Sequence, residues 1–409
     1  MAVSPGARLV SIGGALTAPA DVETGAIAAA LAAAGLPVES RVIVEDDEPA
    51  LEHALAGDAA LTVIITGPGG SAGDVVRRVL ARAAGSRLVL NDRMLAALEE
   101  VHRRQDRPLP RRDERLALLP QGAAVWTATA GEPAWMLDAP RAVVVIPRGS
   151  VGDAAIAGHL LDFARARIGS RGATLVRTLR TAGVSAGDVE ERLADWLGKD
   201  ASVAVIPAPA EGEVWVRLRA RGATIEQAAE TLAPVESAVR AALGADCYGH
   251  DGETLEHVVG RLLGTRGMTL AVAESCTGGL LGHRITSVSG SSAYFERGVM
   301  VYSNRAKQEM LGVPESVLRA HGAVSGPCAE AMAVGICSIA HSDCGLAVTG
   351  IAGPGGATPT KPVGTVYIGV AVGGEVTSQH FRFAGDRAAV KWQSSQMALD
   401  MLRRRLGGV

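Results

Sequence analysis

Short apolar runs alternate with longer amphipathic stretches through the first third of the chain. The stretches have apolar residues at helical spacing, as in Glu23 to Ala34 and Gly73 to Ala84. This alternation predicts an α/β domain with a mainly parallel sheet over residues 1–165. The runs expected to be its strands are "RLVSI" from Arg8, "ESRVIV" from Glu39, "LTVIIT" from Leu61 and "AVVVIP" from Ala142.

One charged, proline-rich segment interrupts this domain. The sequence "RRQDRPLPRRDERLALLP" runs from Arg103 to Pro120. Prolines and dense charge disfavour regular structure. We therefore expect a surface excursion of the first domain rather than a border between domains.

The pattern changes over residues 166–248. The stretches "GDVEERLADWL" and "TIEQAAETLAPVESAVRAALG" favour helices, whereas "SVAVIPAPAEGEVWVRLRA" contains two strand-like runs. These runs predict a hairpin that turns at Glu211-Gly212. The segment is expected to be a small α+β connector between larger domains.

A second layered α/β domain is predicted over residues 249–409. Thr254 caps a helix whose apolar residues share one face, and Gly267 ends that helix. A buried strand follows at about Thr269, and an amphipathic helix from Asp386 to Leu406 closes the domain. The remaining strands are expected at Gly298 to Tyr302, Gly345 to Thr349, Gly364 to Val372 and Val376 to Phe383.

Composition and charge narrow the functional classes. The 409 residues are 48% hydrophobic and 20% charged, without an apolar run near the roughly 20 residues that cross a bilayer. A net charge of −3 and 3% aromatic residues argue against nucleic acid as a partner. The five cysteines form no C-x-x-C pair, which argues against a disulfide framework and a zinc site. Without a signal-peptide pattern, a cytoplasmic protein with small-molecule ligands is expected.

The segment "TLAVAESCTGGLLGHRIT" places a polar, glycine-rich corner between a strand and a helix. Such corners bind ligands because the following helix offers free N–H groups. Ser275 and Thr277 can hydrogen-bond a phosphate or sugar, while Gly278 and Gly279 let the backbone approach it. Cys276 is a rival nucleophile, since a helix N-terminus favours a thiolate. The structural alternative is a capped helix and a tight turn.

A second polar cluster, "SVSGSSAYFERGVMVYSNRAK", contains Ser291, Ser292, Tyr302 and Lys307. A serine hydroxyl becomes nucleophilic when a base removes its proton, and a buried neutral lysine can be that base. Arginine cannot act in this way, and arginine outnumbers lysine 36 to 4 in this chain. Lys307 is therefore a candidate base, with Tyr302 as a proton relay. The alternative is a polar loop with a surface lysine.

Two more segments are candidates for the same pocket. "GLAVTGIAGPGG" again joins a strand to a glycine-rich loop, at Thr349 and Gly350. Arg387 begins the last helix, where a guanidinium can bind a carboxylate or phosphate. The alternatives are a tight loop and a surface ion pair. A G-x-S-x-G motif is absent, and no motif links a histidine to a serine.

Together, "AESCTGGLL", "SGSSAYFERGVMVYSNRAKQEMLGV", "TGIAGPGG" and "KPVGTVYIGVA" resemble the C-terminal amidohydrolase domain of the CinA family, over about Leu255 to Leu406. The resemblance implies metal-free hydrolysis of nicotinamide mononucleotide, in pyridine nucleotide recycling, by a homodimer. It implies that Ser292 is the nucleophile, Lys307 the general base and Tyr302 a supporting hydroxyl. The substrate-binding residues that it implies are Ser275, Cys276, Thr277, Gly278, Gly279, Thr349, Gly350 and Arg387.

The first two domains resemble those of full-length CinA proteins. About residues 8–150 are similar to the molybdopterin-binding, MogA/MoaB-like domain, and about 170–245 to the KH-type connector. The family's glycine-acidic segment appears here as Gly13-Gly14-Ala15-Leu16-Thr17, and its second loop, Thr66 to Val75, keeps only Asp74. Too few carboxylates remain to hold a divalent metal. A structural or partner-binding relic is therefore expected here.

Three functions stay open at this stage. The first is amidohydrolysis of nicotinamide mononucleotide by the third domain. The second is binding of a nucleotide or pterin without turnover. The third is an ADP-ribose pyrophosphatase retained by the first domain, which metal-stimulated cleavage of ADP-ribose would reveal.

Overall fold

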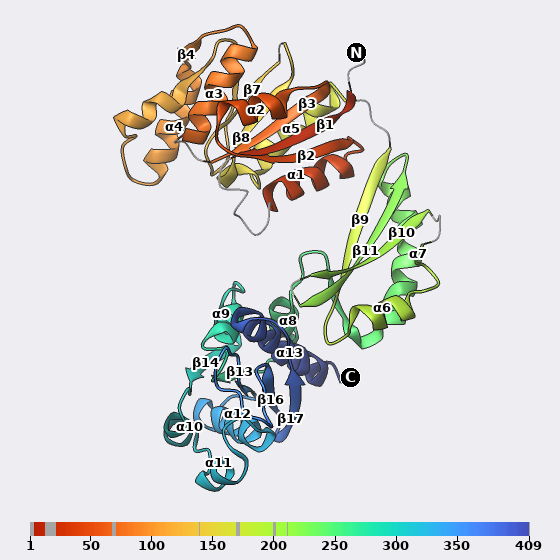
Figure 1. Cartoon of the computed structure of the whole chain (residues 1–409), viewed down its shortest axis with the longest axis vertical. Helices are drawn as coiled ribbons and strands as arrows, with labels where there is room; N and C mark the ends of the chain where they lie inside the picture. Colours follow the sequence, from red (N-terminus) through yellow and green to blue (C-terminus); the bar gives the residue numbers. More distant parts are fainter. Residues whose placement is uncertain are drawn as a thin grey trace. The chain divides into compact units, whose positions relative to one another are not determined.

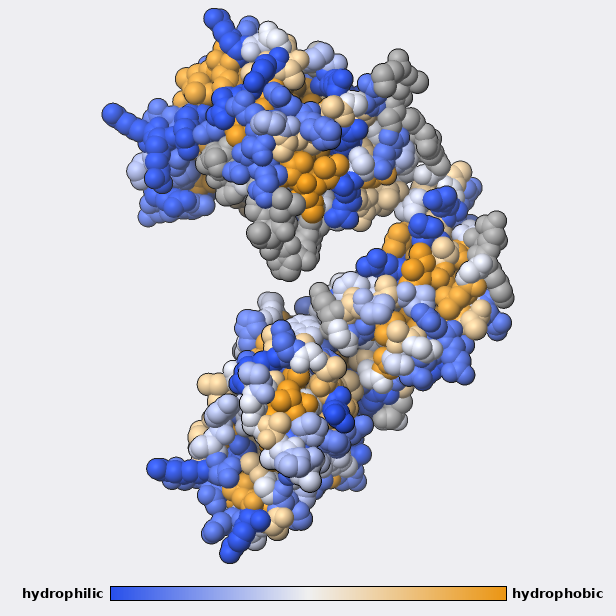
Figure 2. All heavy atoms as spheres, viewed as in Figure 1, coloured by the Kyte–Doolittle hydropathy of each residue, from blue (hydrophilic) through white to orange (hydrophobic). Residues whose placement is uncertain are grey.

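The computed structural model of the chain describes residues 4–12, 22–67, 71–138, 140–168, 172–198, 202–210 and 212–408. The chain divides into two compact units, Met1–Val176 with Arg219–Ala233 and Arg177–Leu218 with Pro234–Val409. Figure 1 shows the helices and strands of both. Among the described helices, none has the length and apolarity needed to cross a membrane. On the face seen in Figure 2, hydrophobic residues form separate patches among hydrophilic ones.

A six-stranded sheet with the order β2-β1-β3-β8-β7-β6 forms the first domain. Neighbours among β1, β2, β3 and β8 pair in parallel, and β7 and β6 add antiparallel strands, so the predicted mainly parallel sheet is confirmed. The elements are β1 (Ser4–Ile12), α1 (Val22–Ala33), β2 (Val38–Val44), α2 (Glu48–Leu55), β3 (Ala59–Thr66), α3 (Ser71–Ala83), α4 (Asp92–Arg104), β6 (Ala124–Trp126), β7 (Ala134–Leu137), β8 (Val143–Pro147), the 3-10 helix η2 (Arg148–Ser150) and α5 (Ala154–Arg165).

The segment from Arg103 to Pro120 is more ordered than expected. It contains the 3-10 helix η1 (Arg111–Ala117) and β5 (Leu118–Pro120), which pairs antiparallel with β4 (Leu88–Leu90). Its charged half is exposed, but Ala117 and Leu119 are buried in the core. Burial of these apolar residues therefore orders the end of the segment, although its charges and prolines disfavour regular structure.

The connector is a four-stranded sheet with the order β10-β11-β9-β12. As predicted, β10 and β11 are neighbours, and Gly212 between them has a φ of +78°. Glu211, the other expected turn residue, lies outside the described residues. The elements are β9 (Ala173–Thr181), α6 (Ala186–Arg192), β10 (Val203–Ala210), β11 (Glu213–Gly222), α7 (Ile225–Leu243), the 3-10 helix η3 (Gly244–Asp246) and β12 (Cys247–His250).

The C-terminal domain is built on a mixed sheet with the order β14-β13-β15-β16-β17. Strand β13 pairs in parallel with β14 and β15, and β16 and β17 continue the sheet antiparallel. The elements are α8 (Leu255–Arg266), β13 (Leu270–Glu274), α9 (Leu280–Thr286), the 3-10 helix η4 (Ser291–Ala293), β14 (Phe295–Met300), α10 (Asn304–Leu311), α11 (Glu315–His321), α12 (Gly326–Ala340), β15 (Cys344–Gly350), β16 (Thr365–Val372), β17 (Glu375–Arg382) and α13 (Arg387–Gly407).

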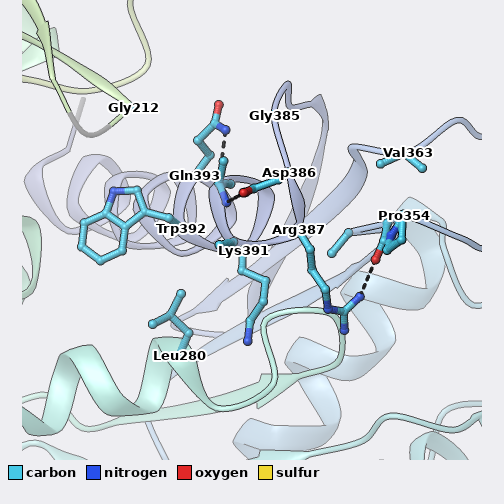
Figure 3. A pocket seen from close by; sticks show the side chains of 14 residues that line it. Gly212, Leu280, Pro354, Val363, Gly385, Asp386, Arg387, Lys391, Trp392 and Gln393 are labelled. Carbon is cyan, nitrogen blue, oxygen red and sulfur yellow. Dashed lines mark hydrogen bonds between the residues drawn. The ribbon is translucent and has the colours of Figure 1, made fainter. Parts of the chain in front are cut away.

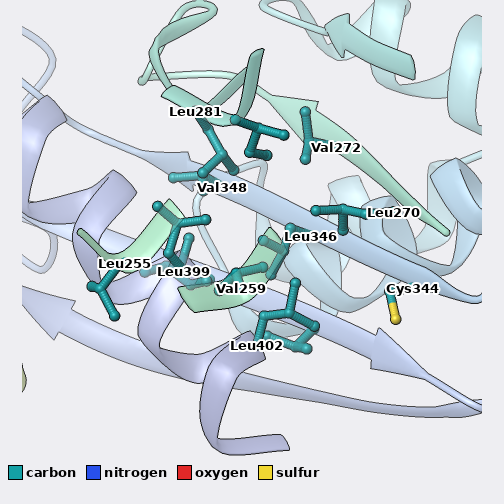
Figure 4. Packing of buried hydrophobic residues seen from close by; sticks show 14 of the residues in the cluster. Leu255, Val259, Leu270, Val272, Leu281, Cys344, Leu346, Val348, Leu399 and Leu402 are labelled. Carbon is teal, nitrogen blue, oxygen red and sulfur yellow. The ribbon is translucent and has the colours of Figure 1, made fainter. Parts of the chain in front are cut away.

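Helices cover both faces of this sheet. Leu270 and Val272 of β13 pack in a cluster with residues of α8 and α13, whereas Ala271 and Ala273 face a cluster built with α10 and α12. Successive strand residues point to opposite faces, so one strand supplies both cores. Figure 4 shows the first cluster, where side chains of α8 and α13 meet those of β13 and β15. The expected α/β/α layering is confirmed.

The helix termini follow the sequence with one correction. Gly267, with a φ of +63°, ends α8 as predicted. Thr254 does precede α8, but its hydroxyl contacts the ring of His257 instead of capping a backbone N–H. Asp386 caps α13 by accepting from the Ala389 N–H at 2.8 Å.

Candidate active site

Three parallel strands of the C-terminal domain end at one edge of the sheet. Ser275 follows β13, and its N–H donates to the Val348 carbonyl of β15 at 2.9 Å. Val301 follows β14, and its N–H donates to the Glu274 carbonyl at 2.8 Å. The backbone therefore joins the three strand ends, which is where α/β sheets bind their ligands.

Lys307 is buried at this edge. Only 1% of the residue is exposed, an unusual position for a lysine. Its Nζ lies 3.1 Å from Ser275 Oγ, 2.8 Å from the Val301 carbonyl and 3.5 Å from the Tyr302 carbonyl. No carboxylate forms an ion pair with Lys307 among the described residues. The amine is thus enclosed by neutral oxygen atoms.

These surroundings suit an uncharged amine. Burial lowers the pKa of Lys307 below its usual value of 10.5. A neutral amine has two N–H donors and one lone pair. As an ammonium, Nζ donates to the Val301 and Tyr302 carbonyls and to Ser275 Oγ; when the amine is neutral, the two carbonyls accept its two N–H groups and the lone pair can accept from Ser275. The contact thus places a serine hydroxyl within hydrogen-bond distance of a buried amine.

Ser292 is not brought to Lys307. It lies on η4, which precedes β14, whereas Lys307 Nζ contacts the residues that follow β14. The six residues of β14 separate these two ends by about 20 Å. Ser292 is also exposed, and so is the Tyr302 side chain, at 70%. The structure therefore places Ser275, and not the expected Ser292, beside Lys307, and Tyr302 contacts Nζ with its carbonyl instead of its hydroxyl.

The buried carboxylate of Glu274 stabilises the corner by accepting hydrogen bonds from its backbone. Its buried carboxylate accepts from the N–H groups of Gly279, Leu281 and Gly282 at 2.8 to 3.1 Å. These amides belong to the N-terminus of α9, where a negative charge is favourable. The expectation that this helix offers its free N–H groups to a ligand is therefore wrong for these three amides.

We expect Glu274→Ala to lower the free energy of unfolding by about 3 kcal/mol, because buried amides lose their acceptor. Denaturant unfolding measures the change. Glu296→Ala removes an exposed carboxylate paired with Arg297 and should leave the free energy of unfolding nearly unchanged. Equal costs for the two variants would contradict the stabilising role of Glu274.

The other corner residues have distinct roles. Burial raises the pKa of the Cys276 thiol to about 12, so the thiolate expected for a rival nucleophile is disfavoured. Thr277 is fully buried, and its Oγ1 has no hydrogen-bond partner among the described residues. Gly278 and Gly279 have φ values of +61° and +92°, which only glycine adopts readily.

Thr349 and Gly350 form the neighbouring wall at the end of β15. The Thr349 hydroxyl is buried and donates to the Ala323 carbonyl at 2.8 Å. A Cβ on Gly350 would lie 2.7 Å from Val366 Cγ2 and 2.8 Å from the Thr365 carbonyl. In this structure both residues therefore shape the strand end by packing.

A cavity of about 1380 Å³ borders the corner on the α13 side. Arg387 and Lys391 line it from the first two turns of α13, four residues apart and so on one face. In Figure 3, Arg387 extends toward Pro354 and donates to the Gly353 carbonyl at 2.8 Å, while Lys391 extends toward Leu280. Ser275 and Lys307 do not line this cavity.

Lys391 connects the cavity with the corner. A Cβ on Gly278 would lie 3.7 Å from Lys391 Nζ, and no ion pair is formed by Lys391 within the described part of the chain. Arg387 and Lys391 thus present two cations beside the loop that carries Ser275. Such a pair suits a phosphate group.

Lys391 and the buried role of Glu274 were not expected from the sequence. The scarcity of lysine that drew attention to Lys307 applies equally to Lys391 and could have identified it. Glu274 has a weaker signal, since a carboxylate at the end of an apolar strand needs buried partners. Its role becomes visible only when α9 turns back onto it.

Asp74, the carboxylate that remains in the second loop of the first domain, is paired with arginines. Asp74 forms ion pairs with Arg77 and with Arg115, the latter at 2.9 Å. The segment Gly13 to Thr17 and residues 68–70 lie outside the described residues. Within the described ranges, no group of three histidine, cysteine, aspartate or glutamate side chains is placed to hold a metal ion.

Three family models match successive parts of the chain. They are a probable molybdopterin binding domain over residues 8–161, the damage-inducible protein CinA KH domain over 176–249, and the CinA C-terminal domain over 252–406. Their order agrees with the three folded parts described above.

Similar proteins cover nearly the whole chain. A CinA-like protein of Geobacter sulfurreducens is 39% identical over 406 residues, which are 97% of this chain and 98% of the relative. A putative competence-damage inducible protein of Symbiobacterium thermophilum is 37% identical over 396 residues, 92% of this chain and 93% of the relative. The crystal structure of a CinA superfamily protein from Klebsiella pneumoniae is 36% identical and covers 38% of this chain and 97% of its own, with a TM-score of 0.37.

Proposed function

The chain belongs to the CinA family, and we propose that its C-terminal domain hydrolyses the carboxamide of nicotinamide mononucleotide to nicotinic acid mononucleotide and ammonia. The CinA C-terminal domain is known as an amidohydrolase of this nucleotide. The observation that carries the proposal is the buried Lys307, with its Nζ 3.1 Å from Ser275 Oγ. A side-chain nucleophile with an adjacent base is one established way to hydrolyse an unactivated amide.

In the first half of the reaction, Lys307 Nζ takes the Ser275 proton as Oγ bonds to the carboxamide carbon. The carbonyl oxygen becomes an oxyanion, and the N–H groups of Thr277 and Gly278 are available to it, since neither has an acceptor in the described part of the chain. The Lys307 ammonium then protonates the amide nitrogen. The carbon–nitrogen bond breaks, and ammonia leaves an acyl ester on Ser275.

In the second half, water attacks the ester carbon while Lys307 takes a proton from the water. The bond to Oγ breaks, and Lys307 returns the proton to Ser275. The product is nicotinic acid mononucleotide in its carboxylic acid form, which gives its proton to water or to the released ammonia and leaves as the carboxylate. Each group ends in its starting state, so the cycle consumes only the nucleotide and one water.

An ammonia assay on the purified protein with nicotinamide mononucleotide tests the proposal directly. The scheme uses only side chains and backbone, so ammonia release should be the same with and without a chelator. A protein that binds the nucleotide without releasing ammonia would be a binding protein, and the proposal would fail.

We expect Arg387→Ala and Lys391→Ala each to raise KM for the mononucleotide about tenfold or more, because each removes a charged partner of the phosphate. Steady-state kinetics with nicotinamide riboside, which lacks the phosphate, provide the control: KM should not rise there. Arg382 is an exposed arginine of β17, and Arg382→Ala should change neither KM for the mononucleotide nor KM for the riboside. Equal increases for both substrates would place the phosphate elsewhere.

A further inference from the structure

The connector reaches the cavity of the C-terminal domain. Gly212, between β10 and β11, lines this cavity together with Trp392 and Gln393 of α13 (Figure 3). A Cβ on Gly212 would lie 3.1 Å from Gln393 Cγ and 3.8 Å from Trp392 Cδ1. The hairpin therefore lies directly against the helix that carries Arg387 and Lys391.

Glu213, the next residue, is buried where the hairpin meets α13. Its carboxylate accepts from Tyr248 Oη at 2.8 Å and Trp215 Nε1 at 2.9 Å, and it also accepts from Gln396 Nε2. Arg180 lies 3.4 Å away and supplies a positive charge. Three of these partners belong to the connector, but Gln396 belongs to α13. Glu213 thus ties the two domains together.

The contacts continue from Gln396 to the cavity wall. Its Oε1 accepts from the guanidinium of Arg284, which is 4% exposed. That guanidinium also pairs with Glu256 at 2.6 Å and lies 4.4 Å over the ring of Trp392. A continuous chain of contacts therefore runs from Glu213 through Gln396 and Arg284 to Trp392.

We propose that the connector contributes to nucleotide binding, and that Glu213 is a positioning residue for the wall of the nucleotide pocket. By holding Gln396 and Arg284, it fixes Trp392 and the first turns of α13, and so sets the affinity for the nucleotide. It takes no part in bond breaking, because Ser275 and Lys307 belong to other elements. The inference rests on the proposed function and adds to it a residue from a second domain.

The first experiment compares Glu213→Ala with Glu190→Ala in the full chain. Glu190 is an exposed carboxylate of α6 and serves as the matched control. Glu213→Ala should raise KM for nicotinamide mononucleotide about tenfold, with kcat within about threefold of the unchanged protein. Glu213→Gln keeps the shape of the side chain and one acceptor oxygen, so it should raise KM less than Glu213→Ala does. If Glu213→Ala does not fold, KM of Glu213→Gln is compared with that of Glu190→Ala instead.

The second experiment does not depend on a ligand. Hydrogen exchange of the amides from Lys391 to Gln396 should be at least about tenfold faster in the Glu213 variants than in Glu190→Ala. Gln396→Leu breaks the same link from the other side, so its effect on KM should not add to that of Glu213→Ala.

The outcomes separate the two proposals. If the unchanged protein releases no ammonia, the proposed function fails, and hydrogen exchange still decides whether Glu213 positions α13. If ammonia is released but KM and exchange in Glu213→Ala match those of Glu190→Ala, the positioning role is overturned. A fall in kcat with KM unchanged would also overturn it.

Discussion

Ser275→Ala lowers kcat for ammonia release from nicotinamide mononucleotide by at least about 10⁴-fold, the size of loss seen when a catalytic serine is removed. The reason is that Ser275 carries the only hydroxyl within hydrogen-bond distance of Lys307 Nζ among the described residues. Binding should survive, because the phosphate contacts lie on α13. Single-turnover kinetics together with a binding titration measure the two effects separately.

Ser292→Ala is the matched control. Ser292 is exposed and lies at the opposite end of β14 from the amine, so its loss should leave kcat within about twofold. The reverse result, with Ser292 essential and Ser275 dispensable, would show that the base acts on a hydroxyl supplied in another way. The assignment of the nucleophile would then be abandoned.

Lys307→Arg should lower kcat by about 10² to 10⁴-fold, the usual contribution of a general base, with little change in nucleotide affinity. Arginine keeps the positive charge but cannot take a proton near neutral pH. The test measures both kcat and the dissociation constant for the mononucleotide. Retention of half the activity or more would exclude Lys307 as the base.

The pH profile gives an independent check on Lys307. Because burial lowers its pKa below 10.5, the amine becomes neutral at a lower pH than a free lysine. The rate should rise with pH up to that lowered pKa and then level off. Between that lowered pKa and 10.5, the unfolded chain binds a proton that the folded chain does not, so stability rises with pH in this second window. Lys307→Met should abolish this part of the pH dependence of unfolding.

Three helices of the C-terminal domain, α10, α11 and α12, were not predicted from the sequence. Its strands and the helices α8 and α13 were largely predictable, because their apolar residues recur at clear periods. The exception is β14, expected to begin at Gly298 but beginning at Phe295. Its residues alternate little in burial, and at the sheet edge Glu296 and Arg297 are exposed. Pairing with β13, rather than a hydrophobic pattern, makes this segment a strand.

Lys307 and Ser275 of the candidate site could be predicted from the sequence, but their pairing could not. Lys307 stood out because the chain so rarely uses lysine, and the corner at Ser275 stood out as a strand end rich in hydroxyls and glycine. Which serine meets the lysine depends on the parallel register of β13 and β14, which places Glu274 beside Met300. Distance along the chain favours Ser292, whereas the register favours Ser275. No local pattern encodes that choice.

The protonation state of the Cys276 thiol determines how readily oxidants modify this residue. Peroxide and alkylating reagents attack thiolates, and a thiol with a pKa near 12 is almost fully protonated in the cell. The residue next to the proposed nucleophile should thus stay unmodified when enzymes that depend on a reactive cysteine are inactivated. The proposed amidohydrolase activity is therefore expected to persist after treatment with a thiol-alkylating reagent at neutral pH.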